Sequence, residues 1–216
     1  MTVFTVEQRE FGWEEIAAAA QQWGEWEPFA AETRYMLACL RYAAATEQMP
    51  AAQEAAVAFR YAHNLISAQD TQRWLNRWQM TAVDWMNCLR GQVLCEQWAA
   101  RLDQIVAAHP VRDDEVAAVI RHFAVCAGKL SEWAQKLAGR AAVVAASGKL
   151  DAGDDDNPHT FVARIEAAFE EQCRAIVTAQ SVAARIADHR LDWLRFDCSS
   201  LWFAEERVAR EALWCL

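Results

Sequence analysis

The chain has 216 residues, of which 54% are hydrophobic, while glycine (7) and proline (4) are scarce. This length is sufficient for a substantial core, and the composition excludes collagen, disordered low-complexity chains and most all-β folds, which need many turns. With 21 Lys and Arg against 30 Asp and Glu, the formal net charge of −9 argues against nucleic acid or an anionic membrane as the main partner.

The sequence also bears on the compartment. Its apolar runs are shorter than the roughly 18 residues of a membrane span. The first ten residues mix acidic, polar and apolar side chains, unlike a signal peptide. Seven cysteines without a C-x-x-C pair are typical of buried thiols in a reducing compartment. We therefore expect a cytoplasmic, mainly helical protein.

Apolar side chains recur at helical spacing along most of the chain, and helix start and stop signals divide this pattern into segments. Ser67 with Asp70, and Thr81 with Asp84, are variants of the capping box, in which a hydroxyl and an acid three residues later satisfy the first backbone N–H groups of a helix. The predicted helices cover residues 11–23, 29–45, 50–63, 71–77, 81–108, 112–144, 158–189 and 204–216.

The stretch over residues 193–203 has a different pattern. Apolar Leu194, Phe196 and Cys198 alternate with polar side chains, which is the period of a half-buried strand. The sequence thus predicts a mainly α fold, an irregular bundle of about seven or eight helices with a short strand near the C-terminus. We expect a helical domain over residues 1–190, followed by a strand plus helix over 191–216.

Tryptophan is unusually frequent, with eleven residues. So many indoles are hard to bury fully, so they either pack between helices or form a surface that grips apolar segments of another chain. Trp74 and Trp78 lie four residues apart beside Arg73 and Arg77, which favours a stacking and cation–π surface for a peptide. The alternative is that both indoles pack on neighbouring helices and the arginines point outward. The candidate peptide-binding residues are Arg60, Tyr61, Arg73, Trp74, Arg77, Trp78, Trp193 and Trp202.

Other chemistry-bearing residues are better explained by structure. His122 and Cys126 share a helix face but lack a second pair of metal ligands, so we interpret them as core or interface residues. Glu166 and Glu170 are typical of a solvated helix face, because the Glu-x-x-His motifs of a di-metal bundle are missing. The sequence contains no phosphate-binding loop, dinucleotide fingerprint or nucleophile elbow. We therefore predict neither a metal, nor a cofactor, nor a catalytic residue.

Two pairs of segments resemble a known family. Residues 59–75 (FRYAHNLISAQDTQRWL) and 81–90 (TAVDWMNCLR) resemble the N-terminal helical region of SurA/PpiC-type peptidyl-prolyl isomerase relatives, in particular the peptide maturation proteins encoded beside ribosomal peptide natural-product precursors. Residues 191–198 (LDWLRFDC) and 204–212 (AEERVAREA) resemble the first strand and helix of a parvulin domain. The rest of that domain, which carries the isomerase site, is absent from this sequence.

The resemblance implies a non-catalytic, chaperone-like protein in the maturation of a ribosomally made peptide natural product. Its expected partner is the precursor peptide or a biosynthetic partner protein, with neither nucleic acid nor membrane involved. The predicted C-terminal strand has an open edge for a client strand or for its copy in a homodimer. Two alternatives stay open: a peptide-modifying enzyme with a new site in the helical domain, and the truncated front of a longer isomerase.

Overall fold

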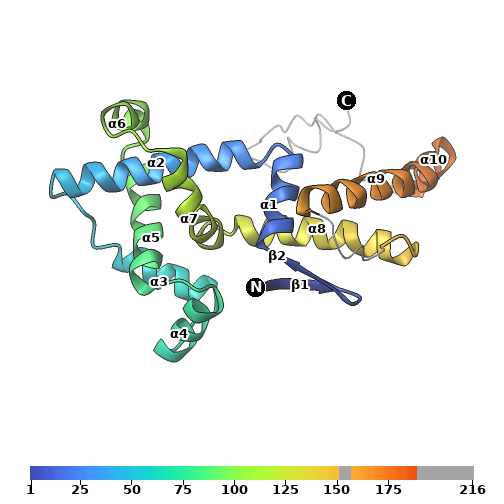
Figure 1. Ribbon diagram of the computed structural model, residues 1–216, viewed down its shortest axis with the longest axis horizontal. Coiled ribbons are helices and arrows are strands. Elements are labelled where there is room, and N and C mark those ends of the chain that lie inside the picture. The colour runs from blue at the N-terminus through green and yellow to red at the C-terminus, as the bar shows by residue number, and fades with distance from the viewer. Residues whose placement is uncertain (151–156, 189–216) are drawn as a thin grey trace, which may run out of the picture. The chain divides into compact units, whose positions relative to one another are not determined.

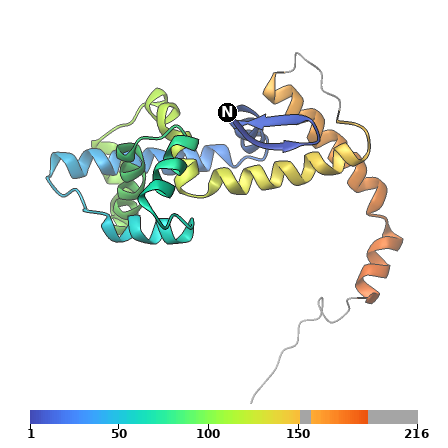
Figure 2. The same cartoon turned by 90° about the horizontal axis from the view of Figure 1, so that it is seen from below.

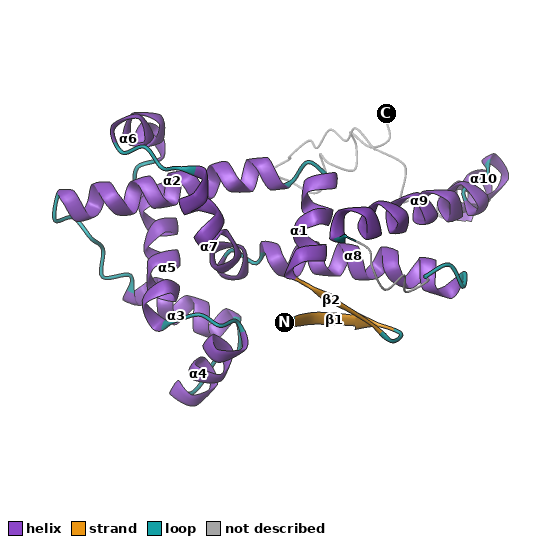
Figure 3. Cartoon of the chain, in the orientation of Figure 1, coloured by secondary structure: helices purple, strands orange, loops and turns teal. Residues whose placement is uncertain are grey.

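The computed structural model describes residues 1–150 and 157–188, which form one two-stranded hairpin and ten α-helices (Figure 1, Figure 3). The predicted mainly α fold is confirmed, although the described part alone contains more helices than expected. By its internal contacts the chain divides into two units, Met1–Gln172 and Cys173–Leu216. The predicted boundary at residue 190, the predicted C-terminal strand and the predicted last helix lie outside the described residues.

The elements follow one another in a simple order. The hairpin consists of β1 (Thr2–Val6) and β2 (Arg9–Gly12). The helices are α1 (Trp13–Gln22), α2 (Trp26–Ala45), α3 (Gln53–Ala62), α4 (Ala68–Arg77), α5 (Ala82–Gln97), α6 (Leu102–Ala108), α7 (Asp113–Cys126), α8 (Lys129–Ala146), α9 (Pro158–Ile176) and α10 (Ala179–Asp188), with a short 3₁₀ helix η1 (Ala99–Arg101) before α6.

The N-terminal hairpin was not predicted. Its strands are antiparallel, and Glu7 adopts a left-handed conformation (φ 52°) in the tight turn between them. The Phe4 and Phe11 rings stack with their centres 4.6 Å apart, and Phe11 is fully buried. β1 packs along α8 and β2 leads into α1, as both Figure 1 and Figure 2 show. The hairpin is therefore part of the core of the first unit.

Helix starts follow the capping signals of the sequence. The Ser67 hydroxyl accepts a hydrogen bond from the Asp70 N–H at 3.0 Å, and the Asp70 carboxylate accepts one from the Ser67 N–H at 3.0 Å. Thr81 and Asp84 exchange the same pair of bonds at the start of α5. Pro28 lies in the first turn of α2 rather than in a break, since the missing N–H there has no helical acceptor to lose.

The three longest predicted helices, over residues 81–108, 112–144 and 158–189, are each interrupted once. The second is divided at Gly128, whose φ of 76° lies in the left-handed region that glycine adopts easily. The first is divided by η1 and the third between α9 and α10. Each prediction therefore located helical sequence correctly but missed an interruption within it.

Two polar clusters, one at Glu25 and one at Glu166, link helices of the first unit. The Trp133 indole and the Lys136 ammonium donate to the two oxygens of the Glu25 carboxylate at 2.7 and 2.5 Å. Glu166 is 5% exposed and accepts from the Trp23 indole at 3.1 Å and from Arg140. The expectation of a solvated face is therefore wrong for Glu166. A buried carboxylate is tolerated there because its oxygens are hydrogen-bonded and its charge is paired.

The described part of the second unit is the end of α9 and the helix α10. Thr178 and Ser181 exchange backbone-to-hydroxyl hydrogen bonds of 2.9 and 3.1 Å before α10, which satisfies first-turn N–H groups. In neither unit does the described part include a helix with the length and apolar character needed to cross a membrane.

Candidate functional site

A cavity of about 310 Å³ lies between the hairpin, α4 and the first turns of α8. Most of its lining is aliphatic or aromatic. Its lining residues are Val3, Phe4, His63, Trp74, Arg77, Trp78, Val125, Gly128, Leu130, Ser131, Ala134, Gln135 and Ala138.

The hairpin wall depends on a β-bulge. Thr2 pairs with Gly12 and Phe4 pairs with Phe11, so Val3 is an extra residue on β1. Successive side chains of a regular strand point to opposite faces, whereas a bulge changes the direction of a side chain. Val3 and Phe4 both line the cavity. The bulge thus explains how adjacent residues contribute to the same wall.

One face of α8 forms the second wall. Leu130, Ala134 and Ala138 follow one another at intervals of four residues, and Ser131 and Gln135 form the adjacent row. The first row ends in Ala134 and Ala138, so the side chains of this wall fill little of the space beside α4. The cavity therefore results from small side chains on α8 facing large ones on α4.

The α4 wall carries the aromatic groups. Leu75, which follows Trp74 directly, is 3% exposed and anchors this helix in the core. The Trp74 ring meets the buried Phe59 ring edge-to-face, with centres 5.2 Å apart. Both Trp74 and Trp78 remain partly exposed. The guanidinium carbon of Arg77 lies 5.3 Å from the centre of the Trp78 ring, so a cation is stacked at the rim of the cavity.

The cavity has a simple electrostatic character. His63 stacks on the Phe59 ring, with centres 4.1 Å apart, and its partial burial lowers its pKa below the usual value of 6.5. The imidazole is therefore mainly neutral at pH 7, which leaves Arg77 as the charged group among the described lining residues. Ser131 and Gln135 add hydrogen-bonding groups. This arrangement suits an apolar side chain with a polar or anionic neighbour.

The structure brings three of the sequence-predicted residues together, since Trp74, Arg77 and Trp78 all line this cavity. Trp74 also packs on Phe59, with ring centres 5.2 Å apart. The peptide-binding role of the two indoles stays a prediction. Arg73 is exposed and lies 3.7 Å from the Asp70 carboxylate, outside the lining. Trp193 and Trp202 lie outside the described residues.

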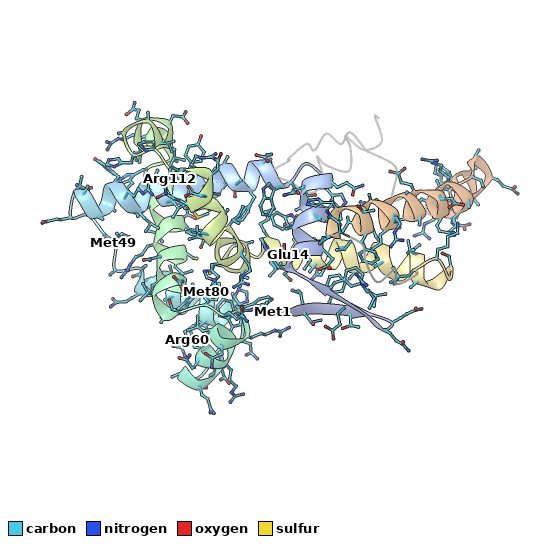
Figure 4. All side chains as sticks on the ribbon, viewed as in Figure 1. Met1, Glu14, Met49, Arg60, Met80 and Arg112 are labelled. Atoms are coloured by element: carbon cyan, nitrogen blue, oxygen red, sulfur yellow. The ribbon has the colours of Figure 1, made fainter. Side chains whose placement is uncertain are left out.

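Arg60 and Tyr61 do not line this cavity. Arg60, labelled in Figure 4, donates hydrogen bonds to the carbonyl oxygens of Leu65 and Ile66 at 3.1 and 2.8 Å, which fixes the turn between α3 and α4. Tyr61 is 74% exposed and lies with Arg60 beside a smaller cavity of about 180 Å³. Arg60 thus supports α4 instead of contacting the space beside Trp74.

The other candidate groups have structural surroundings. The Cys126 thiol is buried and lies 3.9 Å from the Met80 sulfur, as expected of a core residue. A hydrogen bond with Cys126 and burial raise the pKa of the Cys88 thiol. All five cysteines in the described part are free. Within that part, histidine, cysteine and acidic side chains form no group of three or more that could hold a metal ion.

Comparison with known proteins gives no match, whether to a family model, to a curated protein or to a solved structure.

Proposed function

We propose that this chain is a non-catalytic, chaperone-like peptide-binding protein that holds an apolar side chain of a peptide in the cavity between the hairpin, α4 and α8. The observation that carries the proposal is the partly exposed pair of indoles, with Arg77 stacked at their edge, over an apolar cavity. Aromatic residues and arginine are the side chains that contribute most to binding at protein interfaces.

The sequence resemblance supports a particular client. The segment that contains Trp74 is the one that resembles the SurA/PpiC-type peptide maturation proteins, so we propose the precursor of a ribosomally made peptide, or a biosynthetic partner protein, as the ligand. The free thiols of the described part support a cytoplasmic location, because a reducing compartment keeps cysteines unpaired.

The size of the cavity limits the mode of binding. Its volume of about 310 Å³ is at the lower end of the range for ligand pockets, which is enough for one or two large side chains of a peptide. Burying one such side chain contributes about 1.5–3 kcal/mol. A variant with a filled cavity should therefore bind about ten- to a hundredfold more weakly.

The test is a titration of the protein with the precursor peptide encoded beside it, followed by calorimetry and by intrinsic tryptophan fluorescence. Ala138→Phe places a ring in the cavity without removing a core side chain. Gly139→Ala is the matched control on the same helix, because a Cβ at Gly139 meets nothing within 4 Å. We expect saturable binding that Ala138→Phe weakens and Gly139→Ala preserves. Absence of binding to the folded protein, or equal affinity in both variants, would contradict the proposal.

A further inference from the structure

We infer that the cavity selects a peptide in which an apolar residue has an acidic residue next to it, and that Arg77 determines this preference. The apolar side chain enters the space between Trp74 and α8, and the carboxylate pairs with the guanidinium at its rim. This inference rests on the proposed function, because it specifies the class of peptide that the same cavity takes.

The first observation is the pairing of arginines in this acidic chain. Arg34 lies 2.6 Å from Asp113, and Arg73 lies 3.7 Å from Asp70 one turn before Arg77 on the same helix. Arg77 itself has no carboxylate within ion-pair distance among residues 1–150 and 157–188. Other arginines of the described part, such as Arg90 and Arg121, also have no carboxylate at this distance, and Arg77 differs from them because it lines an aromatic cavity.

The second observation is the position of the guanidinium. Its carbon lies over the Trp78 ring, 5.3 Å from the ring centre. Stacking on an aromatic face leaves the N–H groups at the edge of the guanidinium plane free to donate. Two parallel N–H donors match the two oxygens of a carboxylate, and this bidentate arrangement is specific to Arg. Trp78 therefore positions Arg77 for a carboxylate.

The third observation is the charge of the surroundings. Among the described residues, the cavity lining includes no aspartate or glutamate, and partial burial lowers the pKa of His63, so that this imidazole is mainly neutral at pH 7. The apolar walls strengthen a contact ion pair relative to one in bulk water. The overall charge of −9 acts over longer distances and is screened beyond about 8 Å at physiological salt. A bound acidic residue is therefore attracted locally despite the acidity of the whole chain.

Arg77 and the indoles also lie close together along the chain. Arg77 follows Trp74 by three residues and precedes Trp78 directly, so all three occupy the last turn of α4 and its cap. A carboxylate that reaches Arg77 must belong to a residue next to the one whose side chain fills the cavity. We therefore expect the acid at the position adjacent to the apolar anchor.

The test uses three Gly/Ser-rich peptides of equal length that carry Leu-Phe-Glu, Leu-Phe-Gln or Leu-Phe-Lys at the centre. We expect the wild-type protein to prefer Glu over Gln by about three- to tenfold, with Lys weakest. Arg77→Gln should remove the difference between Glu and Gln, and Arg77→Glu should reverse the order of Glu and Lys. Arg73→Gln is the matched control and should keep the wild-type order, since Arg73 already pairs with Asp70.

The outcomes separate this inference from the proposed function. Equal binding of the three peptides, weakened by Ala138→Phe, would overturn the acidic preference and leave peptide binding intact. If Arg77→Gln still prefers the Glu peptide over the Gln peptide, Arg77 does not determine the acidic preference. If none of the three binds while the precursor peptide does, only the inference fails; if the precursor does not bind either, both fail. Circular dichroism verifies that each variant is folded.

Discussion

Substituting alanine for each of two helical glycines should change stability in opposite directions. Gly91 lies in the middle of α5, where an added Cβ meets the Met36 Cβ at 3.0 Å and the Phe123 ring at 3.2 Å. Gly139 lies in α8, where an added Cβ meets nothing within 4 Å. Gly91 thus allows α2 and α7 to approach α5 closely, whereas Gly139 has no such role.

Two opposing contributions determine the change in the free energy of unfolding. Alanine is favoured over glycine in a helix interior by about 1 kcal/mol, and this gain applies at both positions. Overpacking a close-packed site costs about 1–3 kcal/mol, and Met36 cannot swing its Cβ away because that atom is attached to the backbone of α2. We expect Gly139→Ala to stabilise the protein by about 1 kcal/mol, and Gly91→Ala to be neutral or to destabilise it by up to about 2 kcal/mol.

Urea unfolding followed by circular dichroism measures both free energies, and thermal unfolding gives an independent comparison. The difference between the two variants cancels the helix propensity and isolates the close approach of α2 and α7 to α5. A difference of about 1–3 kcal/mol corresponds to roughly 2–12 °C in Tm for a chain of this length. If Gly91→Ala stabilises the protein as much as Gly139→Ala does, the argument from close packing is wrong.

Two further predictions concern charged groups. Glu166→Ala leaves Arg140 without its partner and should cost about 2–3 kcal/mol, whereas Lys149→Ala breaks an exposed 2.7 Å pair and should cost less than about 0.5 kcal/mol; urea unfolding of both variants tests this contrast. Hydrogen bonds from Lys136, and from an indole, lower the pKa of Glu25 below 4.5. The resulting stabilisation is present above that pH and is lost as the pH falls through the folded-state pKa. Glu25→Gln should therefore lose less stability in acid than the wild type. Identical acid unfolding curves of the two proteins would refute the claim that ionised Glu25 stabilises the fold.

The parts of the fold that the sequence predicts correctly are those specified by local signals. Ser67 and Thr81 start α4 and α5 because each hydroxyl and its acid satisfy N–H groups only three residues away. Such a signal does not depend on the rest of the chain. Breaks inside long apolar patterns are different, because apolar spacing continues across Gly128 although the backbone changes direction there.

The hairpin was missed for a related reason. Its strands are only five and four residues long, and its register includes the extra residue Val3, so regular alternation is too short to detect. Its stability comes from contacts distant in sequence. Phe11 is buried partly against Phe161, with ring centres 5.7 Å apart, across 150 positions of chain. Nothing near Phe11 in the sequence indicates that contact.

The candidate site shows the same division between local and long-range information. Trp74, Arg77 and Trp78 are neighbours on one short helix, so their spacing alone indicates a shared surface. The opposite wall is an alanine row on α8, and alanine at helical spacing is equally consistent with tight helix packing. The small size of Ala134 and Ala138 indicates a cavity only when the structure shows that α4 lines the same space.

The small side chains on α8 indicate why the cavity exists. The cavity is open to solvent, because His63, Arg77, Ser131 and Gln135 in its lining are exposed, so its apolar walls contact water when nothing is bound. A leucine at position 138 would fill part of the space and would be as good a helix former as most residues. Ala138 instead leaves the space open beside two partly exposed indoles and an arginine without a carboxylate among the described residues. An open apolar space next to such groups is more consistent with a binding site than with a packing defect, because a defect has no reason to coincide with the aromatic end of α4.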